Sequence, residues 1–87
     1  LGTDHLDTVM SMNNLAMAYK QSNQLHLAMP LLQETLKIRK EKLGIDHPHT
    51  LTSMQNLAAG FNAAGDFDAG LPILEELLEL RKKKLGE

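Results

Sequence analysis

The chain has 87 residues, of which 43% are hydrophobic and 23% are charged, a composition typical of one globular domain rather than a disordered tail. Nine basic residues against eleven acidic ones give a net charge of −2, so we expect no attraction to nucleic acid or to an anionic membrane. The absence of cysteine excludes disulfides, thiolate metal sites and cysteine nucleophiles, and it is compatible with a reducing, cytoplasmic location. No apolar run reaches the ~18 residues that span a bilayer.

An internal repeat with a period of 42 residues organises the sequence. Residues 1–42 and 43–84 are identical at 17 of 42 positions without an insertion, so duplication of one structural unit is the economical explanation. The repeat predicts a first unit at 1–42, a second unit at 43–84, and the start of a third, truncated unit at 85–87. We therefore expect the chain to be a piece of a longer array.

The first unit is predicted to form two antiparallel helices, near 8–22 and 25–43, with Asp7 or Thr8 as the first N-cap. Ser22-Asn23-Gln24 supplies the turn between them. An apolar stripe with helical spacing marks one face of the first helix, consisting of Met12, Leu15, Ala16 and Tyr19. The stripe of the second helix consists of Ala28, Leu31, Leu32, Thr35 and Leu36.

The second unit repeats this pattern with helices near 49–64 and 67–84, and Gly65-Asp66 forms its turn. Pro48 is expected to bar an earlier helical start, which leaves Thr50 as the N-cap and Asp46 as a competitor for the first amides. The two apolar stripes are Met54, Leu57, Ala58 and Phe61, followed by Leu71, Leu74, Leu77 and Leu78. Pro30 and Pro72 lie inside predicted helices at the same repeat position, where we expect a bend or an irregular first turn rather than a break.

Large and small residues recur in the same order in the two units. The first copy is Leu15, Ala16, Tyr19, Asn23, Leu25, Ala28 and Leu32, and the second is Leu57, Ala58, Phe61, Gly65, Phe67, Gly70 and Leu74. This order resembles the interlocking pattern of the tetratricopeptide repeat. The period of 42, the segment Leu43-Gly44-Ile45-Asp46-His47 and the tripeptide Asn-Leu-Ala at 14–16 and 56–58 are similar to the long repeats of the kinesin light chain type. The resemblance implies an all-α fold, a right-handed α-solenoid fragment of two helix-turn-helix units with four antiparallel helices.

The resemblance also implies a concave groove, lined by the first helix of each unit, that receives an extended peptide or a partner helix. By helical phase, the groove residues of the first unit are Met10, Asn13, Asn14, Met17, Lys20 and Gln21, and those of the second are Thr52, Gln55, Asn56, Ala59, Asn62 and Ala63. Asn and Gln offer donors and acceptors to a peptide backbone, and methionine adapts to varied side chains. Asn14 and Asn56 could instead bond to neighbouring helices and fix how the units stack. Because Lys20 is the only cation in this set, we expect no strong clamp for a terminal carboxylate.

The open end of the array suggests a second surface. Each repeat buries its face against the next one, so two units are fewer than the roughly three that usually fold alone. We expect an interface on the last helix, formed by Leu71, Leu74 and Leu78 and covered by neighbouring repeat units or by self-association. The alternatives to a peptide-binding scaffold are therefore a structural spacer or self-association element, and a regulatory segment of a larger multidomain protein.

Catalytic and metal chemistry find little support in the sequence. The chain has no glycine-rich phosphate loop, no nucleophile elbow and no paired His-Glu metal motif, so we expect neither an enzyme nor a bound cofactor. Of the four histidines, His47 and His49 lie closest in sequence, but a pair separated by a proline supplies two metal ligands at best. The basic runs 39–42 and 81–84 are expected to be solvated ends of helices, where cations favour the helix dipole.

Overall fold

The structure, a computed structural model, describes residues 4–86 and contains four helices within them. These helices are α1 (Asp4–Gln21), α2 (Leu25–Leu43), α3 (Pro48–Ala63) and α4 (Phe67–Lys84). No strand occurs between residues 4 and 86, so the predicted all-α solenoid of two helix-turn-helix units is confirmed. Residues 1–3 of the predicted first unit and Glu87 of the predicted third lie outside the described residues.

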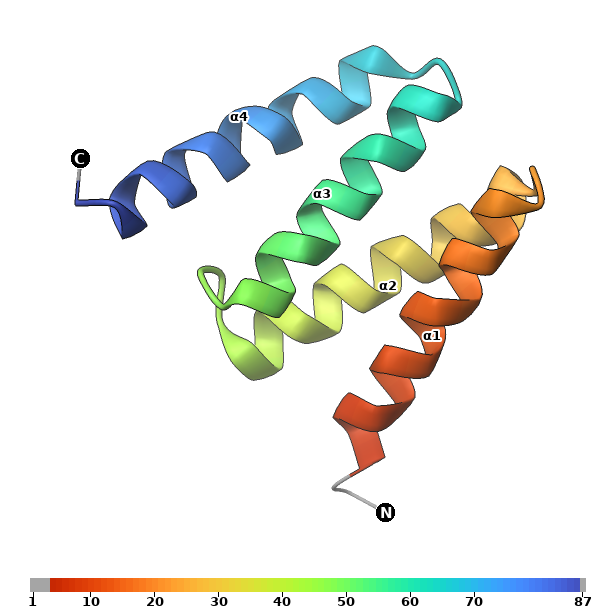
Figure 1. The fold of residues 1–87 in the computed structure, drawn as a ribbon, viewed down its shortest axis with the longest axis horizontal. Helices are drawn as coiled ribbons and strands as arrows, with labels where there is room; N and C mark the ends of the chain where they lie inside the picture. The colour runs from red at the N-terminus through yellow and green to blue at the C-terminus, as the bar shows by residue number, and fades with distance from the viewer. Residues whose placement is uncertain (1–3, 87) are drawn as a thin grey trace.

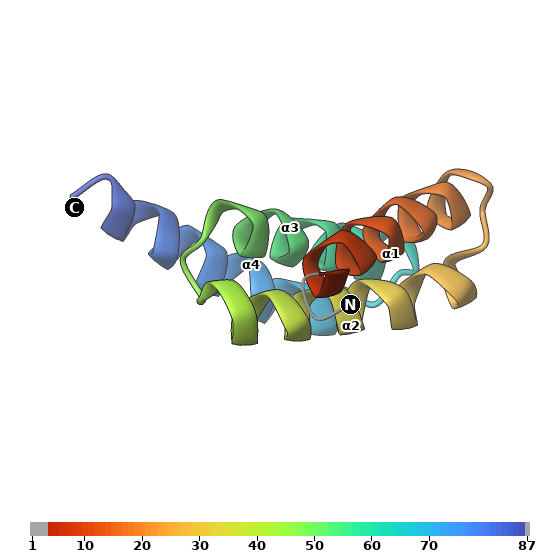
Figure 2. The same cartoon turned by 90° about the horizontal axis from the view of Figure 1, so that it is seen from below.

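The four helices form a thin, two-layered slab, which Figure 1 shows face-on. Viewed edge-on, α1 and α3 make one layer and α2 and α4 make the other (Figure 2). The principal extents are 38 × 37 × 15 Å, and the short one matches two helix layers at the usual separation of ~8–10 Å plus the width of the helices. Each helix packs mainly on the next one along the chain, as expected for a linear array of repeats.

The predicted helix bounds match the structure for α2 and α4 and differ from it at the starts of α1 and α3. The predicted ranges 25–43 and 67–84 are those of α2 and α4. The predicted start near residue 8 is wrong, because α1 begins at Asp4 and Asp7 and Thr8 therefore lie inside the helix. Helix α3 likewise begins one residue earlier than predicted.

The start of α3 shows why the predicted cap was wrong. Pro48 occupies the first turn, where a missing backbone N–H costs nothing, and the side chain of His47 caps the helix. The His47 Nδ1 atom accepts a hydrogen bond from the His49 backbone N–H at 3.0 Å. Neither Asp46 nor Thr50 acts as the cap, and Thr50 is buried within α3.

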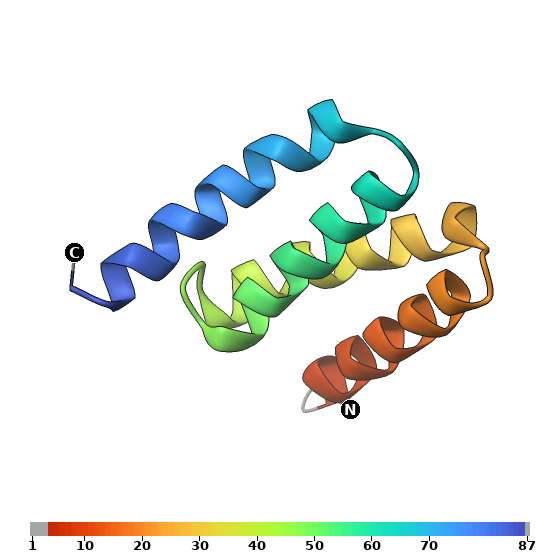
Figure 3. The ribbon, with the colours of Figure 1, turned by 45° about the horizontal axis from the view of Figure 1, so that its top comes forward.

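The turns lie where the sequence predicts, and the two prolines leave their helices unbroken. Asn23 and Gly65 take the left-handed conformation, with φ of 65° and 82°, and so end α1 and α3 ahead of the tight turns. Pro30 and Pro72 lie inside α2 and α4 without splitting either helix. Both units therefore keep the same helix-turn-helix form, which Figure 3 shows from an oblique direction.

Two buried clusters form the core, and both cross between helices. The first combines Ala16, Ala28, Leu32 and Leu57, so it joins α1 and α2 of the first unit to α3 of the second. The other combines Leu51, Met54 and Leu77 between α3 and α4. Leu15, predicted on the same stripe as Ala16, is 47% exposed, whereas Ala16 is fully buried. The boundary between the two units is thus packed as core.

Candidate protein-binding face

The predicted groove residues all belong to α1 and α3, the two helices of one layer (Figure 2). The residues among them that are exposed to solvent are Met10, Asn14, Gln21, Thr52, Gln55, Asn62 and Ala63. The half-buried ones are Asn13, Met17, Lys20, Asn56 and Ala59. This layer therefore presents amides and methionines to solvent over a face made by both units.

The two asparagines of the repeated Asn-Leu-Ala tripeptide have different surroundings. The Asn56 amide nitrogen donates a hydrogen bond to the Asn13 side-chain oxygen at 3.3 Å, which ties α3 to α1 across the layer. Asn14, at the equivalent position of the first unit, is exposed. Asn56 thus makes a stacking contact between units, whereas the side chain of Asn14 is open to solvent.

Two other groove residues contact the last helix. The Arg81 Nη2 atom of α4 donates to the Gln55 side-chain oxygen at 2.9 Å. The side-chain oxygen of Asn62 lies over Gly70, where an added Cβ atom would approach it to 2.8 Å. Since Gly70 also leaves only 3.3 Å between such a Cβ and the Ala58 carbonyl oxygen, α4 can approach α3 closely there.

A hollow that the sequence did not predict lies between α1, the end of α2 and the start of α3. It is lined by Leu6, Asp7, Met10, Arg39, Leu43, His47 and His49. Its wall combines a carboxylate, two stacked imidazoles with ring centroids 5.2 Å apart, and apolar side chains. Only Met10 was a predicted groove residue, because Leu6 and Asp7 precede the predicted groove positions on α1 and the other side chains come from the end of α2 and the start of α3.

Arg39, one of the residues that line this hollow, joins the two units. Its guanidinium Nη1 donates to the Ser53 hydroxyl at 2.7 Å and to the His49 carbonyl at 3.3 Å, and the Thr50 hydroxyl donates to the Arg39 carbonyl at 3.2 Å. Arg39 is only 5% exposed, so the prediction that residues 39–42 are a solvated helix end is wrong at this position. Burial lowers the pKa of the Arg39 guanidinium, and an arginine in a protein nevertheless stays charged.

A signal in the sequence could have identified this junction. Arg39 recurs as Arg81, and Thr50 and Ser53 recur as Thr8 and Ser11. A buried arginine needs hydroxyl or carbonyl acceptors. An arginine and two hydroxyl residues that recur together with the period of the repeat are candidates for such a contact. The periodicity of the polar residues thus carried information that the apolar stripes did not.

The predicted interface residues lie on the open side of α4. Leu71 and Leu78 are more than half exposed, and Leu74 is 37% exposed. Leu77, from the same stripe, is buried against α3. The last helix therefore packs one side on its own unit and presents an apolar face to solvent.

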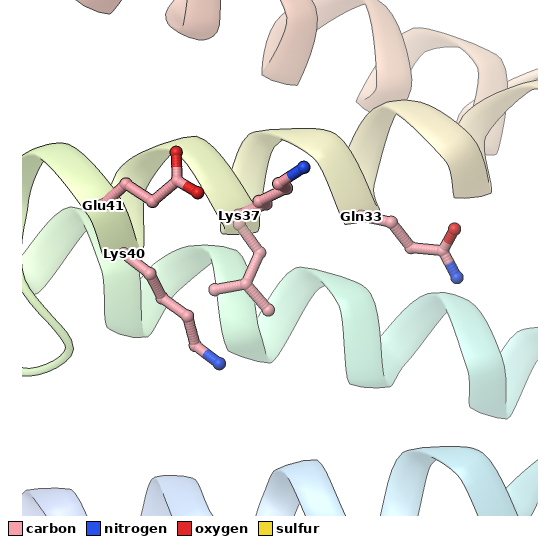
Figure 4. A pocket seen from close by; sticks show the side chains of 5 residues that line it. Gln33, Lys37, Lys40 and Glu41 are labelled. Carbon is pink, nitrogen blue, oxygen red and sulfur yellow. The ribbon is translucent and has the colours of Figure 1, made fainter.

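A surface depression on α2 belongs to the opposite layer from the predicted groove. It is lined by Gln33, Leu36, Lys37, Lys40 and Glu41, which Figure 4 shows from close by. All five come from one helix, and none is among the predicted groove residues. This depression has the mixed polarity of an ordinary solvated helix face.

Within residues 4–86, no three His, Asp or Glu side chains gather closely enough to hold a metal ion. None of the four helices is both long and apolar enough to cross a membrane.

Comparisons with known proteins agree with this geometry. Residues 8–49 and 50–87 match the family described as tetratricopeptide repeat. No curated protein matches the sequence. Two similar crystal structures are of kinesin light chain-like, nearly identical repeats from Podosopora anserina, one of them a Q17M variant.

The similarity extends along the whole chain. It has a TM-score of 0.81 with 28% identity over 93% of the chain for the first structure, and 0.83 with 28% identity over 100% for the variant. The chain spans 38% and 41% of the lengths of those structures. The repeats and these matches support a protein-interaction scaffold in general. On the match to both units, the chain belongs to the tetratricopeptide repeat family.

Proposed function

We propose that the chain is an adaptor that binds an extended peptide or a partner helix along the layer formed by α1 and α3. The observation that carries this proposal is the set of exposed amides on that layer, Asn14, Gln55 and Asn62, together with the exposed Met10 one helical turn before Asn14. Amide side chains can pair with the backbone donors and acceptors of a bound peptide, and the thioether of methionine packs against varied side chains. The hollow beside Met10 would then accept one side chain of the ligand.

The similar structures support the same proposal without defining a ligand. They are described as putative kinesin light chain repeats, and their similarity covers 93% and 100% of this chain. An array of such repeats offers an extended surface, which suits a ligand that contacts several helices in turn.

A test needs a peptide, which can be selected from a random peptide display library with the whole chain as bait. We expect Asn14→Ala to lower the affinity for the selected peptide about three- to tenfold, as measured by fluorescence anisotropy, because the substitution removes roughly one hydrogen bond. Asn14 is exposed, so circular dichroism should show an unchanged fold.

The matched control is Gln33→Ala, an exposed amide on α2 in the other layer. Its affinity for the peptide should equal that of the parent chain. A peptide whose affinity falls with Gln33→Ala and not with Asn14→Ala would contradict the proposed face.

A second candidate role is a spacer or assembly element in which the edges of the array matter more than the groove. The observation that favours it is the apolar face of α4, where Leu71, Leu74 and Leu78 are exposed. Contiguous exposed apolar residues often mark interaction sites.

A further inference from the structure

The contact between the two units provides a template for a contact between two copies of the chain. At this internal junction, the end of α2 packs on the start of α3, and Arg39 is held by the Ser53 hydroxyl and the His49 carbonyl. Thr50 completes the network from α3, and Leu32 and Leu57 share one buried cluster beside it. Both polar and apolar contacts therefore join the units.

Each half of this template recurs at an open edge of the molecule. The α2 half recurs on α4 as Arg81 and Leu74, and the α3 half recurs on α1 as Thr8, Ser11 and Leu15. Thr8 and Ser11 are exposed, whereas their equivalents in α3 are buried. Arg81 is exposed and donates to Gln55 of its own unit rather than to a serine.

The apolar residues at the two edges show the same contrast. Leu32 is 1% exposed, whereas its equivalent Leu74 is 37% exposed. Leu57 is 5% exposed, whereas its equivalent Leu15 is 47% exposed. An edge with an arginine and leucines thus faces outward at one end of the slab, and an edge with hydroxyls and a leucine does so at the other.

Charge and amide pairing favour the same fit. The last turn of α4 carries four cations, Arg81, Lys82, Lys83 and Lys84, and exposed Asp7 lies in the early turns of α1. In the template the equivalent helix ends, the end of α2 and the start of α3, lie side by side. The same arrangement between two copies would place the cations of α4 near Asp7 of the next copy. The Asn13–Asn56 hydrogen bond has its counterpart in Gln55 of one copy and Asn14 of the next.

We propose that copies of this chain associate head to tail, with α4 of one copy docked on α1 of the next as α2 is docked on α3. Arg81 leaves Gln55 and donates to the Ser11 hydroxyl of the next copy, while Gln55 becomes free to pair with Asn14 there. The contact joins two different surfaces, so it does not close at a dimer and extends into an open array. The layer of α1 and α3 then continues from copy to copy.

Sedimentation velocity across a dilution series tests the proposal with the whole chain. The wild type should form species larger than a dimer as concentration rises, and these should shrink with added salt. Leu15→Glu blocks the edge on α1, and Leu78→Glu blocks the edge on α4; both side chains are already exposed, so circular dichroism should show folded chains. Each variant alone should be a monomer.

Mixing the two blocked variants discriminates this arrangement from others. Leu15→Glu keeps its native α4 edge and Leu78→Glu keeps its native α1 edge. One molecule of each can therefore pair, and the mixture should contain a dimer and nothing larger. Self-association of Leu15→Glu alone would overturn the proposal in favour of contacts between two α4 helices. A wild-type chain that stays monomeric at the highest concentration would overturn it outright.

A second pair of variants tests the position of the arginine. Arg39 is buried in the template while its neighbour Lys40 is exposed, so Arg81→Glu should weaken association at least tenfold and Lys82→Glu less than about threefold. The two substitutions change the net charge equally. If Arg81→Glu and Lys82→Glu weaken association equally, the cations act only at long range. That result would overturn the proposal that Arg81 takes the place of Arg39 in the contact.

Discussion

The two units carry the same residues at many repeat positions, but equivalent leucines differ in their exposure to solvent. In the second unit, Leu57 on the first helix is 5% exposed, and in the first unit its equivalent Leu15 is 47% exposed. On the second helix the order is reversed, with Leu32 buried and Leu74 exposed. The burial of a residue in this fold is therefore set by the neighbouring unit, and the junction is the element that determines stability.

The largest expected contrast is between truncations of equivalent leucines. Leu57→Ala should lower the free energy of unfolding by about 2–4 kcal/mol, because it removes buried methyl groups and leaves a cavity. Leu15→Ala should cost less than about 1 kcal/mol, since half of that side chain is already in water. Urea unfolding followed by circular dichroism, at dilutions where the chain is monomeric, gives both values. Equal losses of stability in Leu57→Ala and Leu15→Ala would contradict the conclusion that the neighbouring unit determines which leucine is buried.

The next contrast is between the two equivalent arginines. Arg39→Ala should lower the free energy of unfolding by about 2 kcal/mol, because it removes charge-assisted hydrogen bonds to Ser53 and to the His49 carbonyl in a buried place. Arg81→Ala removes only an exposed bond to Gln55 and should cost under about 0.5 kcal/mol. The same unfolding experiment measures both. A loss for Arg81→Ala as large as that for Arg39→Ala would show that the buried junction has no special weight.

The smallest expected effect sharpens the comparison inside the core. Thr35 is buried, and its hydroxyl has no hydrogen-bond partner among the described residues, whereas the second unit has Leu77 at this position. Thr35→Val keeps the shape and removes the unpaired hydroxyl, so the free energy of unfolding should rise by about 1 kcal/mol. Thermal unfolding provides the measurement, with Thr35→Ser as the matched variant that keeps the hydroxyl. A loss of stability in Thr35→Val would mean that the hydroxyl is satisfied.

The sequence was sufficient for the fold because the repeat and the helical spacing of the apolar residues agree. It placed α2 and α4 at their observed ends, where Asn23 and Gly65 end the preceding helices. The start of α3 was predicted one residue late, since an imidazole cap on a helix that begins with proline leaves only a weak pattern in sequence.

The errors at individual positions have a common physical cause. Leu15 shares an apolar stripe with buried Ala16 yet is 47% exposed, and Arg39, predicted at a solvated helix end, is 5% exposed. Helical phase defines the face on which a residue lies, but it does not say whether another unit covers that face. The groove residues remain predictions for the same reason, because a ligand-binding face and a stacking face share one phase on α1 and α3.

The arrangement in which each helix packs mainly on the next has a consequence for local opening. Helices α2 and α3 each pack on two helices, whereas α4 packs mainly on α3, and α1 packs mainly on α2 with one side-chain hydrogen bond to α3. Backbone amides of α1 and α4 should therefore exchange with solvent first, as the array frays from its outer helices inward. A ligand that spans α1 and α3 would hold the first helix in place, so slower amide exchange in α1 would report its binding before any change in shape.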